Sequence, residues 1–222
     1  MAILHFAYTF DSDIFHERLR PKVVYNGRLD VRKLQLLAKS MVDSASDELQ
    51  LILSHLRYDS EWLEDPDRDQ SQAYLWYMVV LASAFNPCPS LSNNRFRYSH
   101  LVLEKVLPLA GWKKEQIYEL IFGKYSLDTL LTDPGDRIFA DNLSLYGGAL
   151  NTVEVQSILS HLELSRESFL SSVSEIRAAI EEYVVHTEIP PSEILRMTYE
   201  DAVDMLSTSI ARNEALYLLR DS

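Results

Sequence analysis

Two histidines and two glutamates recur in this chain at the same spacing, and together they could hold a divalent metal ion. The word QLILSHL covers residues 50–56, and the nearly identical word QSILSHL covers residues 156–162. A glutamate follows each histidine by six residues, which gives the candidate ligands His55, Glu61, His161 and Glu167. Imidazole and carboxylate groups bind zinc and similar metals, so a metal-dependent hydrolase is one hypothesis. The spacing lacks the helical i, i+4 and Glu-x-x-His patterns, however, and a histidine at a helix end more commonly meets the last carbonyl groups.

A second candidate is an acidic segment in which Asp65, Asp67 and Asp69 alternate as in the first half of a calcium-binding EF-hand loop. The pattern then fails, because Gln70 stands where the sharp turn needs glycine and Trp76 stands where a bidentate glutamate is needed. What remains is an acidic surface for a cationic partner, or simply a solvated loop. The predicted partner-binding residues are Asp59, Glu61, Glu64, Asp65, Asp67 and Asp69.

The stretch of residues 133–151 lacks helical periodicity and contains two consecutive glycines. Long ordered loops in compact domains are commonly functional, so a small-ligand site is a third hypothesis. Its candidate residues are Asp133, Asp136, Arg137, Asp141 and Tyr146. Ordinary turn chemistry explains the same residue types, since Asp favours turns and Gly allows unusual backbone angles.

No other motif indicates catalysis. Cys88 is the single cysteine, and it lies between two prolines with no neighbouring feature that would lower its pKa. The chain has no nucleophile elbow, no glycine-rich phosphate loop and no dinucleotide fingerprint, so we expect no cofactor. A single cysteine excludes an internal disulfide and suits a reducing compartment, so we expect a cytoplasmic protein.

The charge of the chain narrows its partners. Its 222 residues carry a formal net charge of -12, without a Lys/Arg cluster that could displace counterions from nucleic acid. An anionic membrane surface is disfavoured for the same reason, and the longest apolar run, residues 74–82, is too short to span a bilayer. The leading hypothesis is therefore a non-catalytic protein that binds a basic protein partner, for example an immunity or antitoxin-like protein.

The elements that would position these residues are mainly helical. Alternating apolar residues predict a strand over residues 3–10, and Asn26-Gly27 predicts a small hairpin. Asp11 should cap a short helix ended by Pro21, and Asp30 a helix through about Ser44. Further helices are expected at residues 47–56, 72–85, 99–108, 111–123 and 151–164, the last capped by Asn151 with Glu154. One amphipathic helix should follow Ser165, and Pro190-Pro191 should precede a short helix to Met197 and a long one after Thr198.

The repeated word admits two explanations. Residues 48–79 and 154–185 share eleven identities, and these fit either two amphipathic helices of similar composition that match by chance or an old duplication of a helix pair. In either case the leucines and isoleucines of each word should pack in a core. We expect one compact, bundle-like domain over residues 1–222, mainly α-helical, with a small N-terminal β-element.

Overall fold

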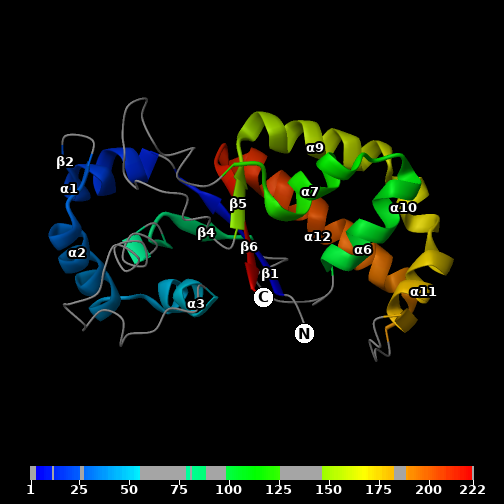
Figure 1. Ribbon diagram of the computed structural model, residues 1–222, viewed down its shortest axis with the longest axis horizontal. Coiled ribbons are helices and arrows are strands. Elements are labelled where there is room, and N and C mark those ends of the chain that lie inside the picture. The colour runs from blue at the N-terminus through cyan, green and yellow to red at the C-terminus, as the bar shows by residue number, and fades with distance from the viewer. Residues whose placement is uncertain are drawn as a thin grey trace. The chain divides into compact units, whose positions relative to one another are not determined.

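The computed structural model describes residues 4–11, 13–25, 28–55, 79–80, 82–88, 99–125, 147–182 and 189–221. They are mostly helical and include a four-stranded sheet and a two-stranded hairpin (Figure 1). Two compact units divide the chain. Unit 1 comprises residues 1–9, 87–126 and 146–222, and unit 2 comprises residues 10–86 and 127–145.

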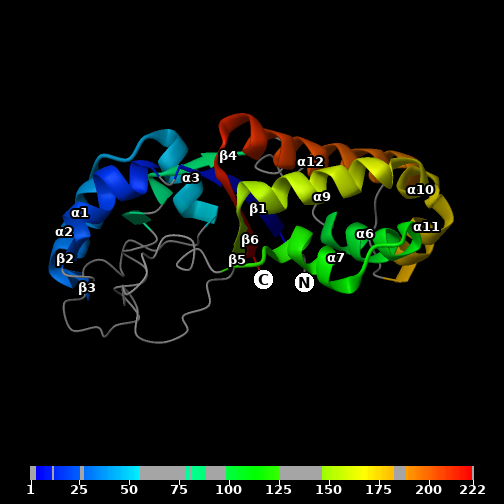
Figure 2. The ribbon, with the colours of Figure 1, turned by 90° about the horizontal axis from the view of Figure 1, so that it is seen from above.

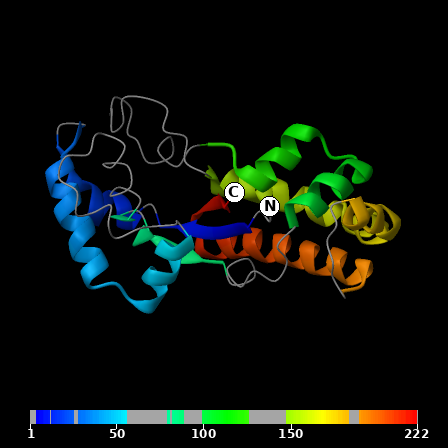
Figure 3. The same cartoon turned by 60° about the horizontal axis from the view of Figure 1, so that its bottom comes forward.

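The sheet brings the two ends of the sequence together. Its strand order is β4-β1-β6-β5, with β1 at Leu4–Phe10, β4 at Phe85–Pro87, β5 at Gly147–Leu150 and β6 at Ala215–Asp221. Strands β1 (blue) and β6 (red) therefore lie next to each other (Figure 3). Strands β5 and β6 are antiparallel, with Gly147 opposite Leu219 and Leu150 opposite Leu216.

Helices pack around this sheet in unit 1. They are α6 (Ser99–Val106), the 3-10 helix η3 (Leu107–Ala110), α7 (Lys114–Phe122), α9 (Thr152–Leu164), α10 (Arg166–Ser171), α11 (Val173–Glu182) and α12 (Pro191–Arg212). Helices α9 and α12 run side by side (Figures 1 and 2). Their apolar faces contribute to one core, whose buried members include Leu107, Leu120, Leu162, Phe169, Leu195 and Leu206.

Unit 2 is built from shorter elements. They are the π-helical turn η1 (Ile14–Leu19), α1 (Arg20–Val23), the hairpin β2 (Val24–Tyr25) and β3 (Arg28–Leu29), α2 (Val31–Asp43) and α3 (Asp47–His55). Phe10 is the centre of an aromatic cluster, with ring centroids 6.1 Å from Phe15 and 5.6 Å from Phe85. Edge-to-face packing of this kind adds stability beyond the burial of apolar area.

Several local predictions are confirmed. The hairpin pairs Val24 with Leu29, on either side of Asn26-Gly27. Asp11 accepts a hydrogen bond from the backbone N–H of Ile14 at 2.9 Å, and Asp30 accepts one from Lys33 at 3.1 Å. Each of these carboxylates satisfies a backbone donor that a helix start leaves without an intrahelical partner.

Other predictions about the helices are wrong. Pro21 does not end the first helical segment but lies in the first turn of α1, where its missing N–H costs nothing. Helix α12 begins at Pro191 for the same reason and continues through Thr198 without a break. The helix expected after Ser165 is instead two, α10 and α11, and the carboxyl-terminal apolar residues form strand β6 rather than the end of a helix.

The repeated word forms a helix in both places. Ile52 and Leu53 are buried in α3, and their equivalents Ile158 and Leu159 are buried in α9. The prediction that the word packs a core is therefore confirmed at these positions. The duplication remains a hypothesis, since similar amphipathic helices need no common origin.

Among the helices that the structure describes, none is both long enough and apolar enough to cross a membrane.

Candidate functional site

An open pocket of about 340 Å³ lies within unit 2, where the end of α2, the first half of α3 and residues 82–86 meet. We call it the α3 groove. Helices α2 and α3 are the blue-to-cyan pair in Figure 3. The lining residues are Met41, Ser44, Ser46, Glu48, Leu49, Ile52, Ala82, Ser83, Phe85 and Asn86.

The sequence builds this groove by stopping one helix and restarting another within a few residues. Helix α2 ends at Asp43, and the Ser44 N–H bonds back to the Ser40 carbonyl at 3.2 Å. Ser46 then caps α3, because its Oγ accepts a hydrogen bond from the Leu49 N–H at 3.2 Å. The two helices are joined by a three-residue turn, so their ends stay close beside the lining strand β4.

The floor of the α3 groove is apolar and firmly held. Ile52, Ala82 and Phe85 are all buried, at 2%, 1% and 4% exposure, and Met41 and Leu49 are half-buried beside them. Phe85 is fixed from behind by its edge-to-face contact with Phe10. The half-buried Met41 and Leu49 can contact an apolar group without rearrangement of the unit 2 core, because part of their surface is accessible.

The rim of the α3 groove is rich in hydrogen-bond acceptors. Ser44 Oγ already donates to the Ser40 carbonyl at 2.7 Å, and Ser83 Oγ donates to the Val80 carbonyl at 2.6 Å. Both hydroxyl oxygens are left with lone pairs to offer. Glu48 is exposed on the same rim, and within the described chain its carboxylate has no ion-pair partner.

Among the described residues that line the α3 groove, none is a lysine, an arginine or a histidine. A ligand that meets this lining finds one carboxylate, several hydroxyl oxygens and the Asn86 amide as polar groups. An anion would also be repelled by Glu48 in the lining, and Glu48 and its neighbour Asp47 both occupy the first turn of α3, where they offset the positive end of the helix dipole. The groove therefore favours a cationic, donor-rich group attached to an apolar stem.

The predicted metal ligands show no metal centre among the described residues. His161 is exposed on α9, where its ring makes an edge contact with Trp112 at a centroid distance of 5.5 Å, and Glu167 is exposed on α10. His55 is the last residue of α3, and Glu61 lies outside the described residues. In the part of the chain that the structure covers, no three His, Cys, Asp or Glu side chains cluster closely enough to hold a metal.

Two further predicted sites fall outside the described residues. The first is the acidic surface of Asp59, Glu61, Glu64, Asp65, Asp67 and Asp69, and the second is the ligand loop of Asp133, Asp136, Arg137, Asp141 and Tyr146. Both stay predictions from the sequence. Only the end of that loop is described, and Gly147–Leu150 forms strand β5 there.

Cys88 is a buried structural residue. Its backbone N–H donates to the Ala7 carbonyl at 3.0 Å, and its side chain is inaccessible to solvent. Burial raises the pKa of the thiol to about 12, and the nearby Arg212 guanidinium opposes that rise only in part. A thiol that stays protonated at neutral pH is a poor nucleophile, which agrees with the structural role expected from the sequence.

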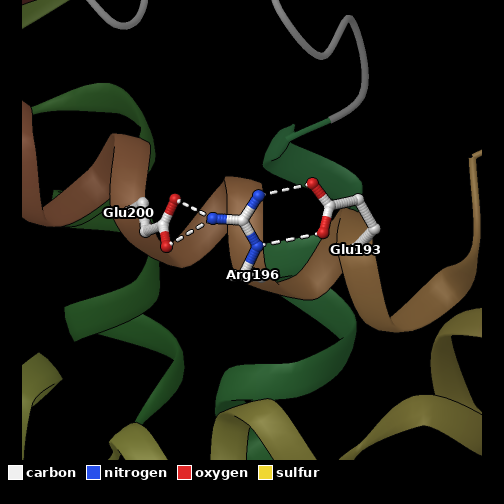
Figure 4. A network of polar contacts seen from close by, with 3 residues as sticks. All are labelled: Glu193, Arg196 and Glu200. Carbon is white, nitrogen blue, oxygen red and sulfur yellow. Dashed lines mark hydrogen bonds and ion pairs between the residues drawn. The ribbon is translucent and has the colours of Figure 1, made fainter.

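A charged cluster on α12 shows how this chain holds a guanidinium group. The Nε and Nη2 atoms of Arg196 donate to the Glu193 carboxylate, and Nη1 donates to both oxygens of Glu200 at 2.7 Å (Figure 4). All three side chains are well exposed and lie three or four residues apart on one helix. Exposed pairs of this kind stabilise a helix slightly and are no binding site.

A second polar cluster ties α9 to the segment after α7. The Glu154 carboxylate accepts from the Tyr125 hydroxyl at 2.6 Å, from Lys124 Nζ at 3.0 Å and from the Asn151 N–H at 3.0 Å. Asn151 Oδ1 in turn accepts from the Glu154 N–H at 3.0 Å, which completes the predicted capping box. Every acceptor here serves the fold, so we assign this cluster a structural role.

Sequence reasoning missed the α3 groove. The polar residues Ser44–Ser46 were expected only to break the helical pattern, and they do so. Their partner segment, residues 82–86, is far away in the sequence and was expected to end a helix. The sequence did contain one signal of this groove. Ser46 is a helix-capping residue, and Asp47 and Glu48 follow it directly, so two carboxylates were predictable at the exposed start of a helix.

Comparisons of the chain with known protein families, with curated proteins and with solved structures find no match. A proposal of function therefore has to rest on the chemistry of the α3 groove and on the charge of the chain.

Proposed function

We propose that this protein is a non-catalytic binding protein for a basic protein partner. The observation that carries the proposal is the α3 groove, whose described lining residues offer a carboxylate and hydroxyl oxygens and include no cationic side chain. The net charge of -12 supports it, because opposite charge on a partner speeds encounter and disfavours acidic competitors. Neutralisation of a basic toxin is one form that such binding would take.

The acidic segment around Asp65 extends the proposal to a second contact area. Its six carboxylates are concentrated between Asp59 and Asp69, in the same unit of the chain as the α3 groove. A basic partner would approach the segment through long-range attraction, and the groove would supply the close contacts.

The test is affinity capture from the native host's cytosol at moderate salt, followed by kinetics with the purified partner. The charge-reversal variant carries Asp65→Lys, Asp67→Lys and Asp69→Lys. The matched control carries Glu163→Lys, Glu167→Lys and Glu175→Lys, three exposed acids of unit 1 that give the same change in net charge. We expect the first variant to lower the association rate of a basic partner at least tenfold at low salt, and the control to lower it less than threefold.

Two outcomes would refute the proposal. One is that the captured proteins include no basic partner at near-stoichiometric amounts. The other is that both variants slow association equally, because net charge alone would then explain the effect.

A further inference from the structure

We infer that the α3 groove is the binding site for a single arginine side chain of the partner protein. This inference deepens the proposed function and rests on it for the identity of the partner. The proposed function does not say which group of the partner is recognised, and this inference assigns that role to a guanidinium group.

The first argument is the balance of donors and acceptors. A guanidinium group carries N–H donors in a planar fork and has no acceptor, whereas the groove offers mainly acceptors. Ser44 and Ser83 have already committed their hydroxyl protons to backbone carbonyls, so their oxygens can only accept from a ligand. Glu48 adds a carboxylate that no described residue neutralises.

The second argument is the apolar floor. An arginine side chain buries its methylene stem along apolar surface while its head group stays hydrogen-bonded. The half-buried side chains of Met41 and Leu49 provide an accessible apolar surface for such a stem, and Glu48 lines the same pocket.

The third argument is size. At about 30 Å³ for each water-sized group, a pocket of about 340 Å³ holds roughly ten such groups, which is room for one arginine side chain and part of its backbone. A pocket this open leaves much of a free small molecule in water, but it suits a side chain whose backbone stays on a partner's surface. Arginine is also among the residues that dominate the binding energy of protein interfaces.

The test uses N-acetyl-arginine-methylamide as the probe, titrated into the isotope-labelled full chain and followed by NMR. Its counterpart N-acetyl-citrulline-methylamide has nearly the same shape without the charge, and the corresponding lysine derivative has the charge without the planar fork. We expect saturable binding of the arginine compound in the millimolar range, with shifts at residues 44–52 and 82–86. The citrulline and lysine compounds should each bind at least about threefold more weakly.

Two variants decide whether Glu48 is the acceptor. Glu48→Gln removes the carboxylate from the groove, and Asp47→Asn removes the same charge from the same helical turn outside the lining. We expect Glu48→Gln to weaken arginine binding about fivefold and Asp47→Asn to change it less than twofold, because an exposed charge pair has a modest strength. Both variants lose the same interaction with the helix dipole, so their folds should be affected alike.

The inference is overturned if the citrulline or lysine compound binds as well as the arginine compound. It is equally overturned if the two variants weaken binding equally, if the shifts fall outside the groove, or if no saturable binding occurs. Failure of the proposed function looks different. If the arginine compound binds in the groove but no basic partner is captured, the proposed function is refuted and the arginine-binding site is retained. If a basic partner is captured but the arginine compound does not bind, the arginine-binding site is refuted and the proposed function is retained.

Discussion

At the scale of single residues, Glu154 connects three neighbouring residues through one side chain. One carboxylate accepts hydrogen bonds from Tyr125, Lys124 and Asn151. Its side chain is only 15% exposed, so it is largely protected from competing water. It therefore joins the start of α9 to the segment that follows α7, because the hydrogen bonds from Lys124 and Tyr125 are additional to those of the helix cap.

We expect Glu154→Ala to lower the free energy of unfolding at neutral pH by about 1 to 2 kcal/mol, because it removes the carboxylate half of the capping box and with it the acceptor of three hydrogen bonds. The exposed Gln156→Ala, two residues further along α9, is the control and should change the free energy by less than about 0.5 kcal/mol. Urea unfolding followed by circular dichroism measures both. Equal effects of the two substitutions would contradict the role assigned to Glu154.

The same carboxylate predicts a pH dependence. Burial raises the pKa of Glu154, but the hydrogen bonds from Tyr125, Lys124 and Asn151 outweigh burial and bring the pKa below its ordinary value of 4.5. The unfolded chain therefore binds the proton at a higher pH than the folded chain does. The stabilisation is complete above pH 4.5 and is lost as the pH falls through the lowered value, so the difference between wild type and Glu154→Ala should shrink there.

At the scale of elements, two glycines decide how closely α7 can approach strand β5. Gly123 ends α7 with a φ of 73°, and a Cβ there would lie 2.3 Å from the backbone carbon of Gly148. A Cβ on Gly148 would lie 2.1 Å from the Phe122 carbonyl oxygen. The backbones touch at this point because neither residue has a side chain.

Gly111 provides a matched control for these two glycines. It has a φ of 83°, but a Cβ there would meet nothing within 4 Å. We expect Gly111→Ala to cost about 1 kcal/mol from backbone strain alone, and Gly123→Ala to cost at least about 2 kcal/mol more, because strain and a backbone clash then add. Chemical denaturation of the two variants makes the comparison. An equal loss of unfolding free energy in the two variants would mean that the backbone at Gly148 moves away from residue 123 without cost.

The elements also show what the sequence can predict. Caps and turns depend on a few adjacent residues, so Asp30, Asn151, Gly123 and the Asn26-Gly27 hairpin were predictable. Strand β6 was not, because its residues Ala215–Leu219 fit the end of an amphipathic helix as well as a strand. Its pairing with β1 and β5 decides the matter, and both partners are far away in the sequence.

The candidate site was hidden for a related reason. Each wall of the α3 groove is ordinary by itself: a serine cap, the end of a helix and a short strand. The groove exists only because residues 82–86 return to the junction between α2 and α3. No periodicity or motif in one segment encodes that meeting, whereas the metal and calcium patterns that a linear reading does detect are incomplete.

At the scale of the whole molecule, the chain passes between its two compact units at four points, and strands β1 and β4 each contain residues of both units. We therefore expect the two units to unfold in a single transition, as one domain over residues 1–222 would. A variant with Trp62→Phe and Trp76→Phe retains only Trp112, which is buried in unit 1, as its fluorescent reporter. Its fluorescence midpoint in urea should coincide with the midpoint from circular dichroism, and two separate midpoints would show that the units are independent domains.

The order of strands in the sheet has a consequence for synthesis on the ribosome. Strand β1 is made before its neighbour β6, which follows it by about 200 residues, a separation also spanned by the hydrogen bond that Arg212 donates to Thr9 at 2.9 Å. At about 5 to 20 residues per second, translation needs roughly 10 to 40 s to supply that neighbour. During that time strand β1, which is rich in apolar residues, cannot pair with β6. A ribosome-associated chaperone that binds β1 should therefore raise the yield of folded protein.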